Sequence, residues 1–245
     1  MKLTRFLLPA FAILALVSCS SSNVEMPKTA EEVFNEGLMH FKNEKYRESS
    51  KYFDIIKLQY PASAYADDAQ YYLAEVNFRE GEYQLGAFSY NMLRRVYPRS
   101  DYAKEALFKT ALCYYKLSPP YDREQEHTLK AIQTFSEFQS VYPSDSLYSV
   151  ATQYIEELRH KLAYREYYNG VIYKKMSYLK AAIIYFNMVI DEYSDTDVAE
   201  DAYFEKIRTL KEMEKTEELK VTIELFRQTY PKSKYNAELA TLEAK

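Results

Sequence analysis

Few side chains in this 245-residue sequence could do chemistry, and they are scattered. The three histidines and two cysteines stand far apart, and no group of them has the spacing of metal ligands. Four glycines leave little room for a loop that cradles phosphate. Adjacent acids such as Glu156–Glu157 and Glu217–Glu218 point to different sides of a helix, as on a solvated face rather than in a catalytic pair. We therefore expect no catalytic residue, no metal and no cofactor. The histidines are His40, His127 and His160.

Cys19 is the residue whose position suggests covalent modification. Residues 1–18 have a short basic start, an apolar run too short to span a bilayer, and small residues at the end, which is the pattern of a secretory signal. The run Leu16–Cys19 resembles the bacterial lipobox, in which the cysteine carries fatty acyl chains such as palmitate and becomes the first mature residue. The alternative is an ordinary signal with a cysteine nearby by chance. A lipidated Cys19 would anchor the chain to a membrane surface.

The polar residues 19–28 are expected to form a tether between the lipid and the folded part. Ser20 stands where an Asp would resemble a signal for retention in the inner membrane, which favours the outer membrane. The net charge of −4, without clustered basic residues, argues against a nucleic acid partner. Cys113 lies in an apolar helical stretch and is expected to be a buried, unreactive thiol.

A short motif, Tyr-Pro-x-Ser-x-Tyr-Ala, divides the rest of the chain into repeats. It begins at Tyr60 and returns at Tyr97, 37 residues later; looser copies begin at Tyr142 and Tyr230, and one at Tyr193 lacks the proline. Because proline removes a backbone donor and disfavours helix at the preceding residue, each motif should end a helix. The serine is expected to be the N-cap of the next helix. Repeats of this length are typical of solenoids.

These repeats predict an all-α fold, an α-solenoid of five tetratricopeptide-like helix-turn-helix repeats over residues 29–245. Small residues recur where paired helices should approach, and aromatic residues recur where one pair should pack on the next. The third repeat holds eight extra residues within 118–127, an expected exposed loop, and the fourth should open with one long helix over 146–175, with a possible bend near Gly170. The predicted repeats are 29–61, 64–98, 101–143, 146–193 and 197–231, followed by a C-terminal capping helix.

The first helices of such an array line a concave groove, and here they carry aromatic residues with a few charges. Such a groove would suit an extended peptide with aromatic side chains, because rigid rings bind at low entropic cost. The alternative for each ring is that it packs between helices. The candidate groove residues are Phe34, Phe41, Tyr71, Phe78, Arg79, Phe108 and Tyr115.

Taken together, the lipobox, the repeats and the Tyr-Pro-x-Ser-x-Tyr-Ala motif resemble the BamD (ComL) family of outer-membrane assembly lipoproteins, in the tetratricopeptide-repeat superfamily. The stretch Leu158–Glu166 is the most specific part of this resemblance, which covers nearly the whole mature chain. Two departures, the missing proline after Tyr193 and an extra residue between Pro143 and Ser146, alter the register of the motif.

The resemblance implies a non-enzymatic subunit of the β-barrel assembly machinery, anchored by lipid to the outer membrane and facing the periplasm. It further implies that the C-terminal repeats, from Tyr178 onward, bind the POTRA domains of BamA. The N-terminal repeats would contact the C-terminal signals of unfolded outer-membrane proteins, which are extended and end in an aromatic residue. Other Bam lipoproteins are further partners under this resemblance. The alternative function is a tetratricopeptide scaffold lipoprotein of another envelope complex, in peptidoglycan synthesis or division.

Overall fold

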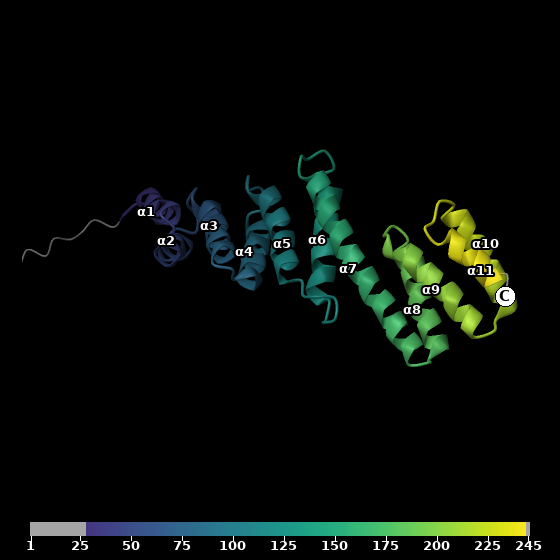
Figure 1. The fold of residues 1–245 in the computed structure, drawn as a ribbon. Helices are drawn as coiled ribbons and strands as arrows, with labels where there is room; N and C mark the ends of the chain where they lie inside the picture. The colour runs from purple at the N-terminus through teal and green to yellow at the C-terminus, as the bar shows by residue number, and fades with distance from the viewer. Residues whose placement is uncertain (1–27, 244–245) are drawn as a thin grey trace, which may run out of the picture.

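The computed structural model describes residues 28–243, which form eleven α-helices and no strand (Figure 1). The expected signal peptide, the Cys19 anchor, and the tether up to residue 27 lie outside this range, as do residues 244–245. The helices are α1 Ala30–Lys42, α2 Tyr46–Gln59, α3 Ala66–Arg79, α4 Tyr83–Val96, α5 Ala103–Leu117, α6 Glu126–Val141, α7 Tyr148–Lys175, α8 Leu179–Glu192, α9 Val198–Glu212, α10 Thr216–Thr229 and α11 Asn236–Glu243.

Neighbouring helices form hairpins that stack side by side along one direction (Figure 1). Each helix packs on the next helix of the chain, and the buried apolar residues form successive clusters along the array rather than one central core. The predicted all-α solenoid of helical repeats is confirmed. No helix within residues 28–243 is both long enough and apolar enough to cross a membrane.

The proline motifs end helices as expected, but their serines do not cap the helices that follow. Helix α2 ends just before Tyr60, whose N–H donates to the Ile56 carbonyl at 2.9 Å. At the second motif the Ser100 Oγ accepts the N–H of Tyr102 at 3.2 Å, one residue before α5 begins. The serine therefore shapes the turn, and the expected N-cap role is corrected, because the chain completes this turn before helical geometry starts. A true capping box joins Thr29 and Glu32 at the start of α1.

Small residues allow close contact within two of the hairpins. A Cβ atom added to Gly37 would lie 2.8 Å from the Phe53 ring, and one added to Gly170 would lie 2.6 Å from the Phe186 ring. Both distances are shorter than a van der Waals contact, so only glycine fits there. Gly170 lies within the uninterrupted helix α7, where it admits the ring of Phe186 from α8.

The long helix expected over 146–175 is present as α7, with 28 residues. The extra residues between α5 and α6 form an ordered loop packed against it. The Gln125 side chain donates to the carbonyls of Pro120 and Arg123, both at 2.8 Å. From α7, the Lys161 ammonium donates to the Ser118 hydroxyl at 2.7 Å.

Candidate functional site

The expected groove residues fall into two rows on the first helices of the first three repeats. Phe34, Tyr71 and Phe108 are spaced by 37 residues, and we call them the covered row. The second set lies seven residues later in each repeat, about two helical turns further along the same helix. We call this set the groove row: Phe41, Phe78 and Tyr115.

The covered row is part of the core, which corrects its expected role in ligand contact. Phe34 and Tyr71 are each 7% exposed. The cause is the last tyrosine of the motif that opens the next repeat: Tyr65 stacks on Phe34 with ring centroids 5.2 Å apart, and Tyr102 stacks on Tyr71 at 4.1 Å. These rings hold successive repeats together.

Phe108, the third member of the covered row, is 6% exposed for a related reason. Its ring meets those of Phe135 and Phe138 edge-on, at 5.5 and 5.2 Å. Leu147 takes the place of the motif tyrosine in the next repeat and packs on the same cluster. The covered row is therefore buried between helices and repeats, where a ligand cannot reach it.

The N–H of Leu147 donates to the Asp145 carboxylate at 2.9 Å, as the N–H of Tyr102 donates to Ser100, so Asp145 replaces the motif serine. The expected extra residue between Pro143 and Ser146 is therefore corrected.

The groove row is only half-buried, and each ring bridges to the first helix of the next repeat. The Phe41 ring meets Tyr72 edge-on at 5.2 Å, and the Lys109 ammonium lies 5.0 Å above the centre of the Phe78 ring. Both partners stand 31 residues after the ring they contact. The repeat thus presents one half-buried ring per unit, at a regular interval, along the first helices of the first three repeats.

Tyr115 continues the groove row across the longer third repeat. Its ring lies 4.6 Å from that of Tyr154, which stands 39 residues later because of the eight inserted residues. Its hydroxyl donates to the Glu157 carboxylate at 2.8 Å. Burial and this carboxylate raise the pKa of Tyr115 to about 12, so the phenol stays neutral and donates at physiological pH.

A charged network underlies the middle of the groove row. The Glu75 side chain is 6% exposed; Lys109 Nζ lies 2.9 Å from it and Arg79 Nε lies 3.8 Å from it. The Tyr90 hydroxyl also donates to this carboxylate. Both cations pair with Glu75, but the Lys109 side chain is 20% exposed and that of Arg79 is 55% exposed, so Arg79 is the more accessible of the two.

Sequence reasoning missed Lys109 and Tyr72, the partners of the first two rings of the groove row. They are themselves 37 residues apart, so aligning the repeats one residue at a time would have found them. The arrangement of half-exposed rings beside Arg79 suits an extended segment with apolar or aromatic side chains. Within residues 28–243 there is no group of three or more His, Cys, Asp or Glu residues that could hold a metal ion.

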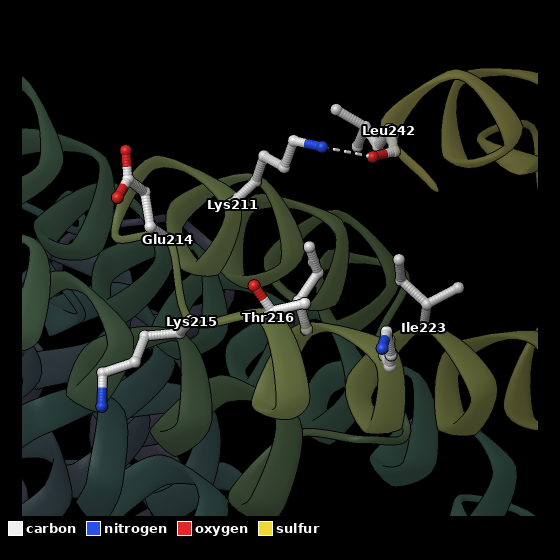
Figure 2. Close-up of a pocket in the computed structure, with 8 residues that line it drawn as sticks. Lys211, Glu214, Lys215, Thr216, Ile223 and Leu242 are labelled. Atoms are coloured by element: carbon white, nitrogen blue, oxygen red, sulfur yellow. Dashed lines mark hydrogen bonds between the residues drawn. The ribbon is translucent and has the colours of Figure 1, made fainter. Parts of the chain in front are cut away.

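A cavity lies at the C-terminal end of the array, between α9, α10 and α11 (Figure 2). This cavity has a volume of about 720 Å³. Lys211 reaches from α9 to α11, where its ammonium donates to the Leu242 carbonyl at 2.6 Å (Figure 2). The cavity is lined by apolar side chains, three lysines, one glutamate and one threonine. The lining residues are Lys211, Glu214, Lys215, Thr216, Leu219, Lys220, Ile223 and Leu242.

The chain has relatives across nearly its whole length. A model of the outer membrane lipoprotein family YfiO matches residues 26–225. The outer membrane protein assembly factor BamD of Rickettsia prowazekii (strain Madrid E) is 25% identical over 239 residues, covering 96% of this chain and 95% of that protein. The BamD of Pasteurella multocida (strain Pm70) is 23% identical over 182 residues, covering 68% and 70%. A solved tetratricopeptide repeat protein from Parabacteroides merdae is 14% identical and covers 88% of this chain and 74% of its own, with a TM-score of 0.39.

Proposed function

The chain belongs to the YfiO family of outer membrane lipoproteins, and on that premise we propose that it is a subunit of the machinery that assembles β-barrel proteins in the outer membrane. The observation that carries the proposal is the relation to an outer membrane protein assembly factor over 96% of this chain and 95% of that relative. A match of that extent concerns the whole repeat array and not one hairpin. The subunit acts by binding, as a non-enzymatic scaffold.

We propose that Cys19 carries the lipid, so that the array faces the periplasm from the outer membrane. The lipobox-like end of residues 1–18 supports this. The lipid would fix the position of the protein and not its fold, because the buried core clusters of the described residues are built from Ala30 onward. Cys19→Ala should therefore release the protein from the membrane while its thermal unfolding midpoint stays the same. Membrane retention of the variant, or loss of its fold, would count against the proposal.

The C-terminal repeats are proposed to bind the POTRA domains of BamA. Two features support this location: the cavity beside α11, and the exposed apolar residues Val221 and Leu225, four apart on α10. The test is affinity purification of the full-length chain from gently solubilised envelopes. Val221→Glu with Leu225→Glu should lower the recovery of BamA at least tenfold.

A matched control for this purification is Leu58→Glu with Leu129→Glu, which adds the same charge at exposed apolar sites outside the C-terminal repeats. The control pair should recover BamA as the unchanged chain does. Equal loss in both variants would place the interface elsewhere. Recovery of division or peptidoglycan proteins, with no barrel subunit, would favour the alternative of a scaffold for another envelope complex.

The groove row is proposed to contact the C-terminal signals of unfolded barrel proteins. Half-exposed rings at a constant interval, with Arg79 among them, fit an extended segment that ends in an aromatic residue. Phe78→Ala should weaken binding of a labelled C-terminal peptide of a β-barrel protein about tenfold, measured by fluorescence anisotropy. Leu85→Ala, at an exposed leucine on α4, is the control and should bind normally. Equal affinities of the two variants would exclude the groove row as the contact.

A further inference from the structure

The second half of α7 presents a bare apolar face. Tyr164, Tyr168, Ile172 and Met176 follow one another at intervals of four residues, so they lie in one row along the helix. Their exposed fractions are 37, 38, 37 and 56%. We call this row the α7 stripe. Contiguous exposed apolar side chains of this size mark interaction sites on soluble surfaces.

The stripe is bare because α7 is longer than its neighbour. The earlier first helices α3 and α5 each pack on the second helix of the preceding repeat. The equivalent neighbour of α7 is α6, which packs on its first half, as the stacking of Phe135 on Tyr154 at 5.0 Å shows. Figure 1 shows α7 running on beyond α6 toward the turn into α8. Over this second half, no helix within residues 28–243 takes the place of a preceding helix.

The inserted loop packs on the start of this second half. The Tyr121 ring meets Tyr164 and Tyr168 edge-on, at 4.9 and 5.5 Å. Beyond the loop, from Tyr168 to Met176, the stripe extends for about 12 Å, at about 1.5 Å per residue. That is the length of roughly two turns of helix, so this uncovered part of the face has room for a partner helix of at least two turns.

Cations flank the stripe. At about 100° per residue, Lys175 falls within the arc of the stripe and Arg165 at its edge nearest α8, where its charge also acts on Tyr185 and Tyr193. Glu166 lies further round the helix, toward α8. The Asn169 amide donates to Glu166 at 3.2 Å. Neither Arg165 nor Lys175 forms an ion pair within residues 28–243. Apolar residues flanked by free cations call for a partner with acidic flanks.

The same charges argue against a second copy of this chain. Pairing two stripes antiparallel about the Tyr168–Ile172 midpoint would set Arg165 opposite Lys175. Pairing them in parallel would set each cation against its equivalent. Like charges face each other either way, which disfavours self-association.

We propose that the α7 stripe binds an amphipathic helix of a partner protein, with apolar residues at every fourth position and acidic residues on either side. The helix fills the place of the missing neighbour of α7 and extends the array locally. This inference does not depend on the assembly role proposed above.

The test measures binding of two designed, fluorescently labelled helical peptides to the full-length chain in detergent. Both carry leucine at every fourth position; one has glutamate flanks and the other has lysine flanks. The glutamate peptide should bind more tightly. Arg165→Glu with Lys175→Glu should weaken the glutamate peptide at least tenfold and strengthen the lysine peptide, because these changes reverse the flanking charge and leave the apolar row intact.

The matched control, Lys57→Glu with Arg99→Glu, changes net charge equally at exposed sites on other repeats and should leave both affinities unchanged. Equal binding of the two peptides, or equal loss in both double variants, would overturn the proposal. A dimer seen by sedimentation would also overturn the proposal if Ile172→Glu abolished it and Ile184→Glu, at an exposed site on α8, did not. That result would mean that a second copy of the chain covers the stripe.

A photo-crosslinking residue at Ile172 of the lipidated chain then tests the partner in intact envelopes. The crosslinked segment, sequenced by mass spectrometry, should have the proposed apolar and acidic pattern. Crosslinks to lipid alone, to a second copy, or to segments without this pattern would contradict the proposal.

Discussion

Lys109→Met should destabilise the array by about 3 kcal/mol, because it leaves Glu75 charged and buried without its closest cation. Breaking a buried ion pair costs about 3–5 kcal/mol. Here Lys109 is 20% exposed, the Tyr90 hydroxyl still donates to Glu75, and Arg79 Nε lies 3.8 Å from the Glu75 carboxylate. These three features together reduce the cost of losing the ion pair to about 2–3 kcal/mol. The lost contact of the ammonium with the Phe78 ring adds about 0.5–1 kcal/mol.

The assay is thermal unfolding followed by circular dichroism at pH 7. For a chain of this size about 1 kcal/mol corresponds to roughly 2–4 °C, so the midpoint should fall by about 6–12 °C. Lys116→Met, at an exposed lysine on the same helix, is the control and should move the midpoint by less than about 2 °C. Adding Glu75→Gln to Lys109→Met removes the unpaired charge and should restore at least half of the loss.

Two results would refute this reasoning. One is a midpoint for Lys109→Met no lower than that of Lys116→Met, which would mean that solvent already screens the pair. The other is a double variant no more stable than Lys109→Met, which would mean that the loss comes from packing of the lysine stem and not from the stranded carboxylate.

Three further predictions concern other parts of the array. Gly170→Leu should lower the free energy of unfolding by about 1–3 kcal/mol, and the unfolding midpoint with it, because the new side chain meets the Phe186 ring. Adding Phe186→Ala should recover part of the loss, and an unchanged midpoint in Gly170→Leu would show that the two helices separate freely. Burial raises the pKa of the Cys113 thiol to about 12. At pH 8 this thiol should therefore react with a thiol reagent at least a hundred times more slowly in the native protein than in denaturant. Equal rates would mean that α5 opens readily. The hydrogen bond from Arg159 holds the pKa of Asp195 below its usual value, so this pair stabilises the fold above about pH 4 and loses that contribution as pH falls through the folded-state pKa. Asp195→Asn should therefore cost less than about 1 kcal/mol at pH 7, since the pair is partly exposed, and less still at pH 2; a larger cost at pH 2 than at pH 7 would reverse the sign of this argument.

The repeat architecture was predictable because its signals are local. A proline after a tyrosine ends a helix through its own backbone, so the ends of α2, α4 and α6 follow directly from the motif. After Ser146 the apolar residues keep helical spacing with no proline, and this local pattern predicted the long helix α7. The serine N-caps failed because the motif forms a turn of its own before the next helix begins.

The candidate site was less predictable because exposure depends on contacts between repeats. Tyr71 and Phe78 both fall on the groove side of one helix, yet Tyr102 covers the first and leaves the second half-exposed. The spacing of 31 residues between Tyr71 and Tyr102 recurs between Phe34 and Tyr65, so the pattern was present in the sequence. That this spacing buries the first ring of each pair could be inferred only by knowing which helices lie side by side.

The most direct test of the proposed role is to deplete the chain in its own cells and measure folded β-barrel proteins in the outer membrane. Folded barrels migrate differently from unfolded ones on unheated gels, so the two forms can be quantified together. The account predicts that folded barrels fall while unfolded forms accumulate in the periplasm, and that the unchanged chain restores them. Normal barrel levels in depleted cells, with a defect confined to division or to peptidoglycan, would contradict it.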